Sequence, residues 1–106
     1  MTKKIYIAGP LLNTHEKRYL EKIALELESN DFECFLPHRD QKGVTEEELN
    51  QLDMSKATKE KIFNNDLNAL ETSDLTVALL TGQDIDSGTA AEIGFSYANK
   101  KPVVAI

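Results

Sequence analysis

The chain has 106 residues and a mass of 11.9 kDa, which is enough sequence for one domain and too little for two. With 41% hydrophobic and 28% charged residues, the composition excludes a disordered or fibrous protein. The 12 basic and 18 acidic residues give a net charge of −6, so the overall field repels phosphate backbones. We therefore expect a single domain over residues 1–106 that has no nucleic acid polymer as a partner.

The cysteine and histidine content limits the chemistry further. A single cysteine, Cys34, excludes an internal disulfide, and its apolar neighbours predict a buried, inert thiol. The only histidines, His15 and His38, do not combine with it into a zinc-ligand spacing, so we expect no metal. No apolar run approaches the about 18 residues of a membrane span, and no export signal is visible. These features favour a cytoplasmic protein with no membrane partner.

In chain order, the first half predicts two strands and a helix. Residues 4–8 (KIYIA) form a β-rich run that the pair Gly9-Pro10 stops. From 16 to 29 the apolar residues recur at the spacing of an amphipathic helix. Residues 32–36 (FECFL) predict a second strand, followed by a polar loop over 38–43. The weak periodicity of 44–55 allows a short helix.

The second half is more regular. Residues 57–71 predict a helix with an apolar stripe that includes Ile62, Phe63 and Leu67, and Asp66 falls on that same stripe. Residues 74–80 are apolar on both faces, which is typical of a central parallel strand. A polar loop over 81–86, a helix over 87–98 and a final strand over 103–106 complete the chain.

This order of elements predicts a doubly wound, Rossmann-like α/β fold. We expect four parallel strands in the order 2-1-3-4, with helices on both faces. In such sheets, ligands bind beyond the carboxyl ends of the strands, near the point where the strand order reverses. That rule selects the loops at 9–10, 38–43 and 81–92. The final strand would lie exposed at an edge, so a homodimer or larger oligomer is also expected.

Three acidic residues are candidates for chemistry. Glu92 is the only charge between Asp86 and Lys100. Either it serves a reaction or it completes a capping box with Thr89, and the pattern leaves both explanations open. Asp86 is best explained as an N-cap or first-turn acid. Asp66 has no capping role in mid-helix and needs a partner or a ligand.

Other common sites are not supported by the sequence. Gly9 stands alone, and Gly82, Gly88 and Gly94 are too far apart for a dinucleotide or phosphate loop, so no cofactor of that kind is expected. Ser87 does not lie in a nucleophile elbow. Carboxylates remain as the reactive groups.

Three segments and a dipeptide together resemble a known family. They are residues 4–10 (KIYIAGP), 64–68 (NNDLN), 86–94 (DSGTAAEIG) and 101–102 (KP). In this order they resemble the nucleoside 2-deoxyribosyltransferases and the related deoxynucleoside 5′-monophosphate N-glycosidases. The third segment is the most specific. The resemblance implies a cofactor-free enzyme of nucleoside salvage that acts on a deoxynucleoside and a free nucleobase.

The resemblance also implies roles for individual residues. Glu92 occupies the position of the nucleophile, and Tyr6 that of a tyrosine that hydrogen-bonds it. Asp66 and Asp86 match the acids that hold the nucleoside, and Gln41 falls near a glutamine that contacts the base. Asp66 is also a hypothetical proton donor to the departing base. The same matching segments add three substrate-binding positions: Gly9, Ser87 and Gly88.

The implied reaction is a double displacement. Glu92, expected to be ionised in the first turn of its helix, would attack the anomeric carbon and form a 2-deoxyribosyl-enzyme. A second base would then attack from the opposite face, and two inversions would restore the configuration. Attack by water would instead make the enzyme a hydrolase.

Two alternatives concern the substrate and the activity. The charge of Asp86 would repel a 5′-phosphate, which favours a free nucleoside. Ser87 and Thr89 at the helix start could nevertheless accept a phosphate, as a nucleotide hydrolase would require. A non-catalytic nucleoside-binding module is the second alternative. The family commonly continues some tens of residues beyond 103–106 with a segment that helps complete a neighbouring subunit's site, so this chain is shortened by comparison.

Overall fold

A parallel sheet of four strands forms the centre of the protein. The computed structural model describes residues 2–11, 14–81 and 85–106, so the predicted loop over 81–86 lies partly outside the described residues. The strand order is β2-β1-β3-β4 and every pair is parallel, which confirms the predicted fold class and order. The strands are β1 (Lys4–Ala8), β2 (Glu33–Phe35), β3 (Leu75–Ala78) and β4 (Val103–Ala105).

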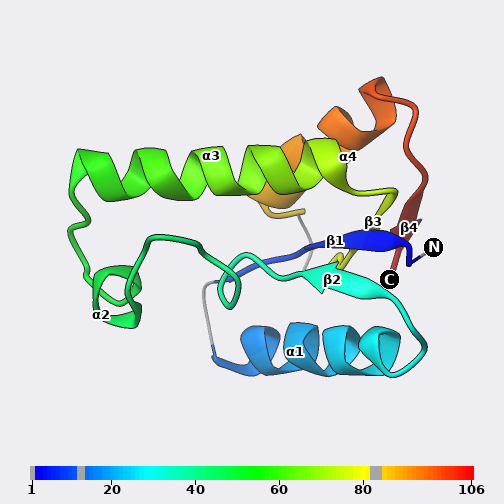
Figure 1. The fold of residues 1–106 in the computed structure, drawn as a ribbon, viewed down its shortest axis with the longest axis horizontal. Coiled ribbons are helices and arrows are strands. Elements are labelled where there is room, and N and C mark those ends of the chain that lie inside the picture. Colours follow the sequence, from blue (N-terminus) through cyan, green and yellow to red (C-terminus); the bar gives the residue numbers. More distant parts are fainter. Residues whose placement is uncertain (1, 12–13, 82–84) are drawn as a thin grey trace.

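Helices cover both faces of this sheet. Figure 1 shows α1 (Thr14–Glu28) below the sheet and both α3 (Lys56–Thr72) and α4 (Ser87–Ala98) above it. The short helix expected between 44 and 55 is α2 (Glu46–Leu49), a single turn. Its N-cap Thr45 and Glu48 form a capping box, which stabilises one turn without any apolar stripe. Within the described ranges, no helix is long and apolar enough to cross a bilayer.

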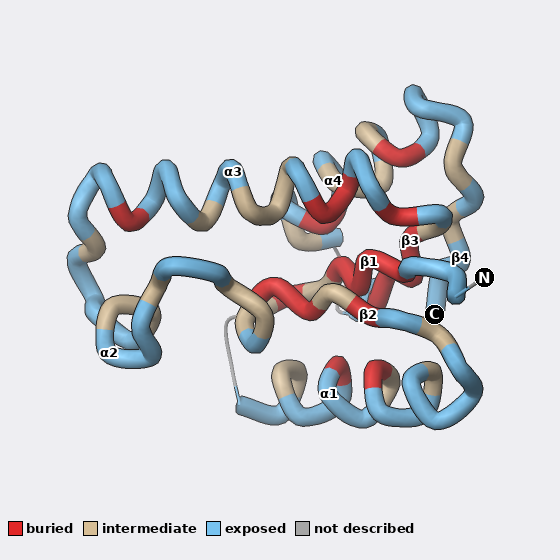
Figure 2. Tube along the Cα trace, in the orientation of Figure 1, coloured by how far each residue is buried: buried red, intermediate tan, exposed pale blue. Residues whose placement is uncertain are grey.

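The core below the sheet follows the two-residue alternation of β1 and β3. Ile5 and Ile7 point toward α1, where they pack with the fully buried Leu20 and Ala24. Cys34 belongs to the same cluster, and burial raises the pKa of its thiol to about 11. The predicted buried cysteine is thereby confirmed. Figure 2 shows that buried positions concentrate in the two central strands.

The opposite face of the sheet combines one large side chain with several small ones. Tyr6 and Ala8 of β1 lie beside Ala78 of β3, and they pack with Ala69 and Leu70 of α3. Small side chains at these positions leave room for helices to approach the sheet closely. Tyr6 is fully buried between them and is the largest buried side chain described.

The apolar stripe predicted for α3 is wrong at one position. Phe63 is 64% exposed, whereas Thr58 and Leu70 are buried. Figure 1 gives the reason, because the N-terminal half of α3 extends past the edge of the sheet toward α2. A helix that overhangs in this way has no sheet beneath its first turns, so its stripe has no single surface to cover.

Two basic residues make hydrogen bonds that connect neighbouring elements of the fold. Lys101 donates through Nζ to the carbonyl oxygens of Leu70 and Glu71, at 2.5 and 2.6 Å, and so satisfies the last turn of α3. Arg39 forks between Asp40, with Nε–Oδ1 2.8 Å, and Glu28, with Nη2–Oε2 3.0 Å. These contacts tie the segment between α4 and β4 to α3, and the loop after β2 to α1.

Gly9 ends β1 at a point where a side chain would collide with the core. A Cβ built there lies 2.7 Å from Leu20 Cδ2 and 3.3 Å from Leu79 Cβ. Leu20 is completely buried, so it has no free space to turn into. Packing alone therefore accounts for glycine at this position.

We expect Gly9→Ala to lower the free energy of unfolding by about 1–3 kcal/mol, because the extra methyl group overpacks the core. Urea titration checks this. Gly94→Ala is the matched control, since its Cβ meets nothing within 4 Å, and alanine in a helix should stabilise by about 0.5–1 kcal/mol. Equal stability of Gly9→Ala and the parent would contradict the packing argument.

Candidate active site

A hydrogen bond between the sheet and α4 joins Tyr6 to Glu92. Tyr6 lies in the middle of β1, and its hydroxyl donates to Oε2 of Glu92 on α4. The Tyr6 ring stacks on Phe35 of β2, with centroids 5.5 Å apart and planes 19° apart. Burial, with the charges of Glu92 and Asp66, raises the pKa of Tyr6 far above its ordinary value. The phenol therefore keeps its proton and acts as a donor.

Glu92 is a half-buried carboxyl whose proton affinity is unusual. Burial raises the pKa of Glu92 from 4.5 to about 7, the Tyr6 hydrogen bond opposes this rise, and the charges of Asp66 and Asp86 add to it. The expected position in the first turn is wrong, because α4 begins at Ser87 and Glu92 lies in its second turn. The helix dipole acts within the first turn and therefore does little to keep Glu92 ionised. Near neutral pH, the group exists in both protonation states.

The capping-box explanation for Glu92 is also wrong. The N-cap of α4 is Asp86, whose Oδ2 accepts from the Thr89 backbone nitrogen at 3.2 Å and from its hydroxyl at 3.3 Å. A helix has one N-cap, and Asp86 occupies that position three residues before Thr89. The structure thus confirms Asp86 as the N-cap.

The start of α4 places the remaining candidates of this segment. Ser87 is exposed at the first helical position, and Gly88 lies four residues before Glu92, on the same helix face. A Cβ at Gly88 would lie 3.2 Å from Asp86 Oδ2. Thr89 is 1% exposed and engaged with Asp86, so it does not present the open phosphate-binding group expected of it.

Asp66 on α3 is held by a glutamine from the loop after β2. Gln41 donates through Nε2 to Asp66 Oδ1 at 2.8 Å and to the Pro37 carbonyl at 2.7 Å. Its Oε1 accepts from Asn65 Nδ2 at 3.1 Å, and Asn65 also donates to the Lys42 carbonyl at 2.8 Å. Burial raises the pKa of Asp66, and the Gln41 hydrogen bond partly opposes the rise. The mid-helix acid therefore has the partner that its position required.

Asp66 also connects the Tyr6–Glu92 pair with a cleft of about 640 Å³. The lining combines side chains from the loop after β2 and from three helices, and neither Tyr6 nor Glu92 is part of it. Asp66 lines the cleft, and its charge raises the pKa of Glu92. The polar and apolar groups that face the cleft include Gln41, His38, Leu11, Val44, Met54 and Ile62.

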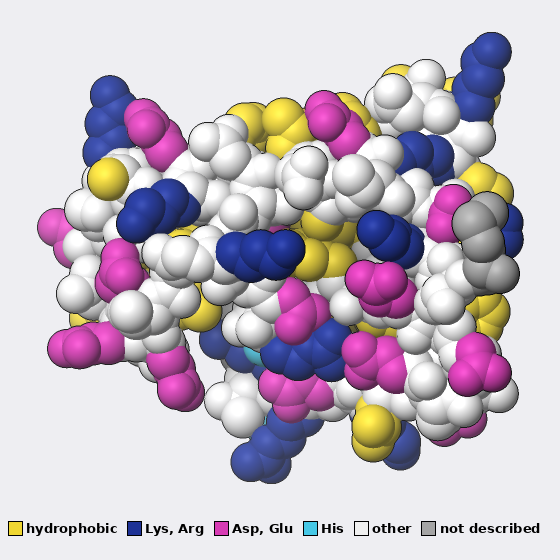
Figure 3. Space-filling model, in the orientation of Figure 1, with side chains coloured by type: hydrophobic (Ala, Val, Ile, Leu, Met, Phe, Trp, Pro, Cys, Tyr) yellow, Lys and Arg dark blue, Asp and Glu magenta, His cyan; other side chains and the backbone are white. Residues whose placement is uncertain are grey.

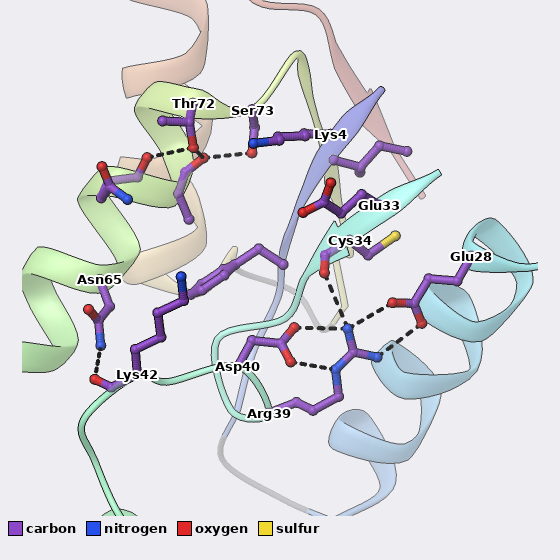
Figure 4. Close-up of a pocket in the computed structure, with 14 residues that line it drawn as sticks. Lys4, Glu28, Glu33, Cys34, Arg39, Asp40, Lys42, Asn65, Thr72 and Ser73 are labelled. Atoms are coloured by element: carbon purple, nitrogen blue, oxygen red, sulfur yellow. Dashed lines mark hydrogen bonds and ion pairs between the residues drawn. The ribbon is translucent and has the colours of Figure 1, made fainter. Parts of the chain in front are cut away.

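A second cavity, of about 500 Å³, lies between α3 and the edge strand β2. Figure 4 shows its polar wall, where the Arg39 guanidinium is held between Glu28 and Asp40. Figure 3 shows apolar atoms at the bottom of a hollow on this face, bordered by charges of both signs. None of Tyr6, Asp66, Asp86 and Glu92 lines this cavity, so it is separate from the candidate site.

The structure thus brings together Tyr6, Glu92, Asp66 and Gln41, with Asp86 close enough for its charge to act on Glu92. Gly9 is explained by packing against Leu20. Sequence reasoning missed Phe35 and the part that Asn65 plays in holding Gln41. The alternation in residues 32–36 could have indicated the first, because β1 pairs with β2 so that Tyr6 lies opposite Phe35. Among the described residues, no group of three or more His, Cys, Asp or Glu could hold a metal ion.

The raised pKa of Glu92 gives a prediction for stability. The pKa of Glu92 is higher in the folded than in the unfolded protein. The free energy of unfolding therefore falls as the pH rises from about 4.5 through about 7. Glu92→Gln removes this loss. The free energy of unfolding of the variant, relative to that of the parent, should therefore increase by about 2–3 kcal/mol between pH 5 and pH 8. Urea unfolding at both pH values checks this. Glu26→Gln, at an exposed position on α1, should show no such increase.

Comparisons with known proteins were made with both sequence and structure. The family model described as nucleoside 2-deoxyribosyltransferase matches residues 5–106. A nucleoside deoxyribosyltransferase of Limosilactobacillus fermentum is 33% identical over 115 residues, an alignment that covers 97% of this chain and 64% of the relative. The chain thus spans less than two thirds of that relative's length.

Solved structures with the same fold include three relatives. A conserved protein from Enterococcus faecalis V583 is 33% identical, with a TM-score of 0.75, over 99% of this chain and 63% of its own. The 2-deoxyribosyltransferase of Bacillus psychrosaccharolyticus is 30% identical, with a TM-score of 0.77, over 96% and 70%. A CMP N-glycosidase of Clostridium botulinum, 21% identical with a TM-score of 0.64 over 97% and 66%, shares the fold. With a family match over residues 5–106, the chain belongs to the nucleoside 2-deoxyribosyltransferase family.

Proposed function

We propose that this protein is a nucleoside 2-deoxyribosyltransferase that moves 2-deoxyribose from one nucleobase to another through a covalent bond to Glu92. The observation that carries the proposal is the half-buried Glu92 carboxyl, held through Oε2 by a fully buried tyrosine and close to two further acids. A half-buried carboxyl that is held through one oxygen can attack an electron-poor carbon with the other once it is ionised. The family match over residues 5–106 supports the same activity.

In the first half of the reaction, Glu92 acts as the nucleophile. Tyr6 fixes Oε2, and Oε1 attacks C1′ of the deoxynucleoside while the C1′–N bond to the base breaks. The electron pair of that bond goes to the base nitrogen. The product is a 2-deoxyribosyl ester of Glu92 and a free base.

The departing base needs a proton, which Asp66 supplies. Burial raises the pKa of Asp66, and this favours the protonated carboxyl that a general acid needs. Asp66 lines the cleft, and Gln41 orients its carboxyl through Oδ1. Gln41 thereby acts on the base side of the site by positioning Asp66.

In the second half, another base attacks C1′ from the face that the first base left. Its nitrogen bonds to C1′, the ester bond breaks, and the proton of the incoming nitrogen passes to Asp66. Two inversions restore the original configuration at C1′. A water molecule in place of the base would complete a hydrolysis, which is the alternative N-glycosidase activity.

The charges of the site favour a free nucleoside over a 5′-nucleotide. The negative charge of Asp86 reaches Glu92, so a 5′-phosphate near Asp86 would be repelled. Thr89, which a phosphate site would need, is buried and bonded to Asp86. We therefore propose that Asp86, with Gly88 and Ser87 beside it, contacts the hydroxyl groups of the sugar. We also propose that Gly9 borders the site.

We further propose that the protein is a single domain that acts as a cytoplasmic homo-oligomer. The edge strand β4 supports self-association, because Val104 and Ile106 are 52% and 50% exposed and apolar. The buried thiol Cys34 is consistent with a reducing compartment. A nucleoside-binding module without catalysis is the competing function on this fold, and the next experiment separates the two.

Incubation with deoxyinosine should give a 2-deoxyribosyl adduct on Glu92, which mass spectrometry of the intact protein and of its peptides detects. The carboxylate and the C1′ carbon form this bond only in an enzyme, so a binding module would show no adduct. Adding adenine should then yield deoxyadenosine. Free deoxyribose in place of deoxyadenosine would identify a hydrolase.

The matched control is Glu92→Gln, which keeps the shape of the side chain and an acceptor for Tyr6. It should form no adduct and lose at least about 10³-fold in base exchange. Base exchange at the parent rate in this variant would refute the proposed function.

A separate prediction concerns the proton from Asp66. Asp66→Asn should slow hypoxanthine release from deoxyinosine by roughly 10²-fold or more, because the base leaves without general acid assistance. Release of 7-methylguanine from its deoxynucleoside should be much less affected, since that base is already cationic and needs no proton to leave. Initial rates with the two substrates check this. An equal loss on both would remove Asp66 from the role of proton donor.

A further inference from the structure

A second polar contact joins α4 to the sheet, four residues after Glu92 in the sequence. Ser96 Oγ lies 2.8 Å from Thr76 Oγ1 of β3. The two residues are 0% and 1% exposed. A buried hydroxyl without a partner is unfavourable, so each of these groups depends on the other. The pair is the only described hydrogen bond between the side chains of β3 and α4.

This contact lies directly beside the Tyr6–Glu92 bond. Thr76 is the register partner of Tyr6 in the parallel pairing of β1 with β3, so both side chains point to the same face. Ser96 and Glu92 are four residues apart and lie on one face of α4. Two neighbouring sheet residues therefore hold two helix residues one turn apart.

The apolar packing beneath α4 is made by partly buried side chains. Ile93 and Phe95 are partly buried against the apolar cluster of the sheet. Apolar contact has no preferred direction, whereas a hydrogen bond weakens when its angle or length changes. A helix held at one polar point can pivot about it, and a second point one turn away prevents that rotation.

We propose that Thr76 and Ser96 are positioning residues, whose buried hydrogen bond fixes the rotation of α4 on the sheet and so holds the Glu92 carboxyl against Tyr6. This inference rests on the proposed function for its effect on turnover. The contact with substrate stays with Glu92 and Asp66, and the hydroxyl pair acts only through the placement of Glu92.

The test separates the hydroxyl of Thr76 from its shape. Thr76→Val keeps the branched shape and loses the hydroxyl, whereas Thr76→Ser keeps the hydroxyl. We expect Thr76→Val and Ser96→Ala to lower kcat for base exchange from deoxyinosine by roughly tenfold or more, with KM within about twofold of the parent. Thr76→Ser should stay within about threefold of the parent kcat.

The matched control is Ser73→Ala. Ser73 is also a buried serine, 6% exposed, and its hydroxyl donates to the Ala69 carbonyl at 2.6 Å. It lies between α3 and β3 and makes no described contact with α4. Its kcat should equal that of the parent, even where its melting temperature falls as far as that of Thr76→Val.

The double variant Thr76→Val with Ser96→Ala replaces both hydroxyls and leaves no unpaired polar group, so it should fold where a single variant is unstable. Its kcat should match that of Thr76→Val. A kcat within twofold of the parent in the folded single or double variants would overturn the proposal. The proposal would also be overturned if kcat in Thr76→Ser and Ser73→Ala fell in step with the melting temperature, as closely as it does in Thr76→Val.

A readout without turnover keeps this test independent of the proposed function. With ¹³C-labelled glutamate, the Glu92 carboxyl resonance can be assigned from its absence in Glu92→Gln. In Thr76→Val its titration midpoint should lie above that of the parent, because a loosened Tyr6 hydroxyl stabilises the carboxylate less. An unchanged midpoint would overturn the positioning role. If the parent protein exchanges no base while Thr76→Val still shows the shifted midpoint, the proposed function alone is refuted.

Discussion

The hydrogen bond from Tyr6 to Glu92 depends on where the sheet places β1. Because β1 has a strand on either side and helices on both faces, Tyr6 is completely removed from water in the middle of the molecule. A phenol in that position must donate to something, and the lone carboxyl of α4 is the acceptor. The small residues Ala8 and Ala78 on the same face leave room for α4 beside it. The contact between Tyr6 and Glu92 is thus a consequence of how β1 is packed.

Burial and neighbouring groups then set the proton affinity of the carboxyls. Burial disfavours the charge on Glu92 and on Asp66, and the charge of Asp66 raises the pKa of Glu92 further. Each acid also accepts a hydrogen bond that favours its ionised form, Glu92 from Tyr6 and Asp66 from Gln41. The two carboxyls therefore differ in what surrounds them, although both are acids in the same part of the fold.

Much of this arrangement could be predicted from local patterns. Short apolar runs separated by amphipathic helices predicted the strand order, and a single charge on an otherwise neutral helix singled out Glu92, which accepts the hydrogen bond from Tyr6. The local pattern could not decide which residue is the N-cap of α4, because Asp86 and Thr89 both precede residues that can complete a cap. It also could not pair Tyr6 with Glu92 across 86 residues, since no periodicity records a contact between distant elements. That pairing came from the family resemblance.

The error on α3 follows from the same geometry that serves the site. Phe63 is exposed because the first half of α3 overhangs the sheet, and this overhang leaves one helix face over the cleft. Ile62 and Asp66 lie on that face, so a stripe that would be uniformly apolar over a sheet here mixes an apolar wall with a buried acid. Gln41 offsets the cost of burying that acid by donating a hydrogen bond to it, and Asn65 in turn donates to Gln41. The position that breaks the helical pattern is thus a position that lines the cleft.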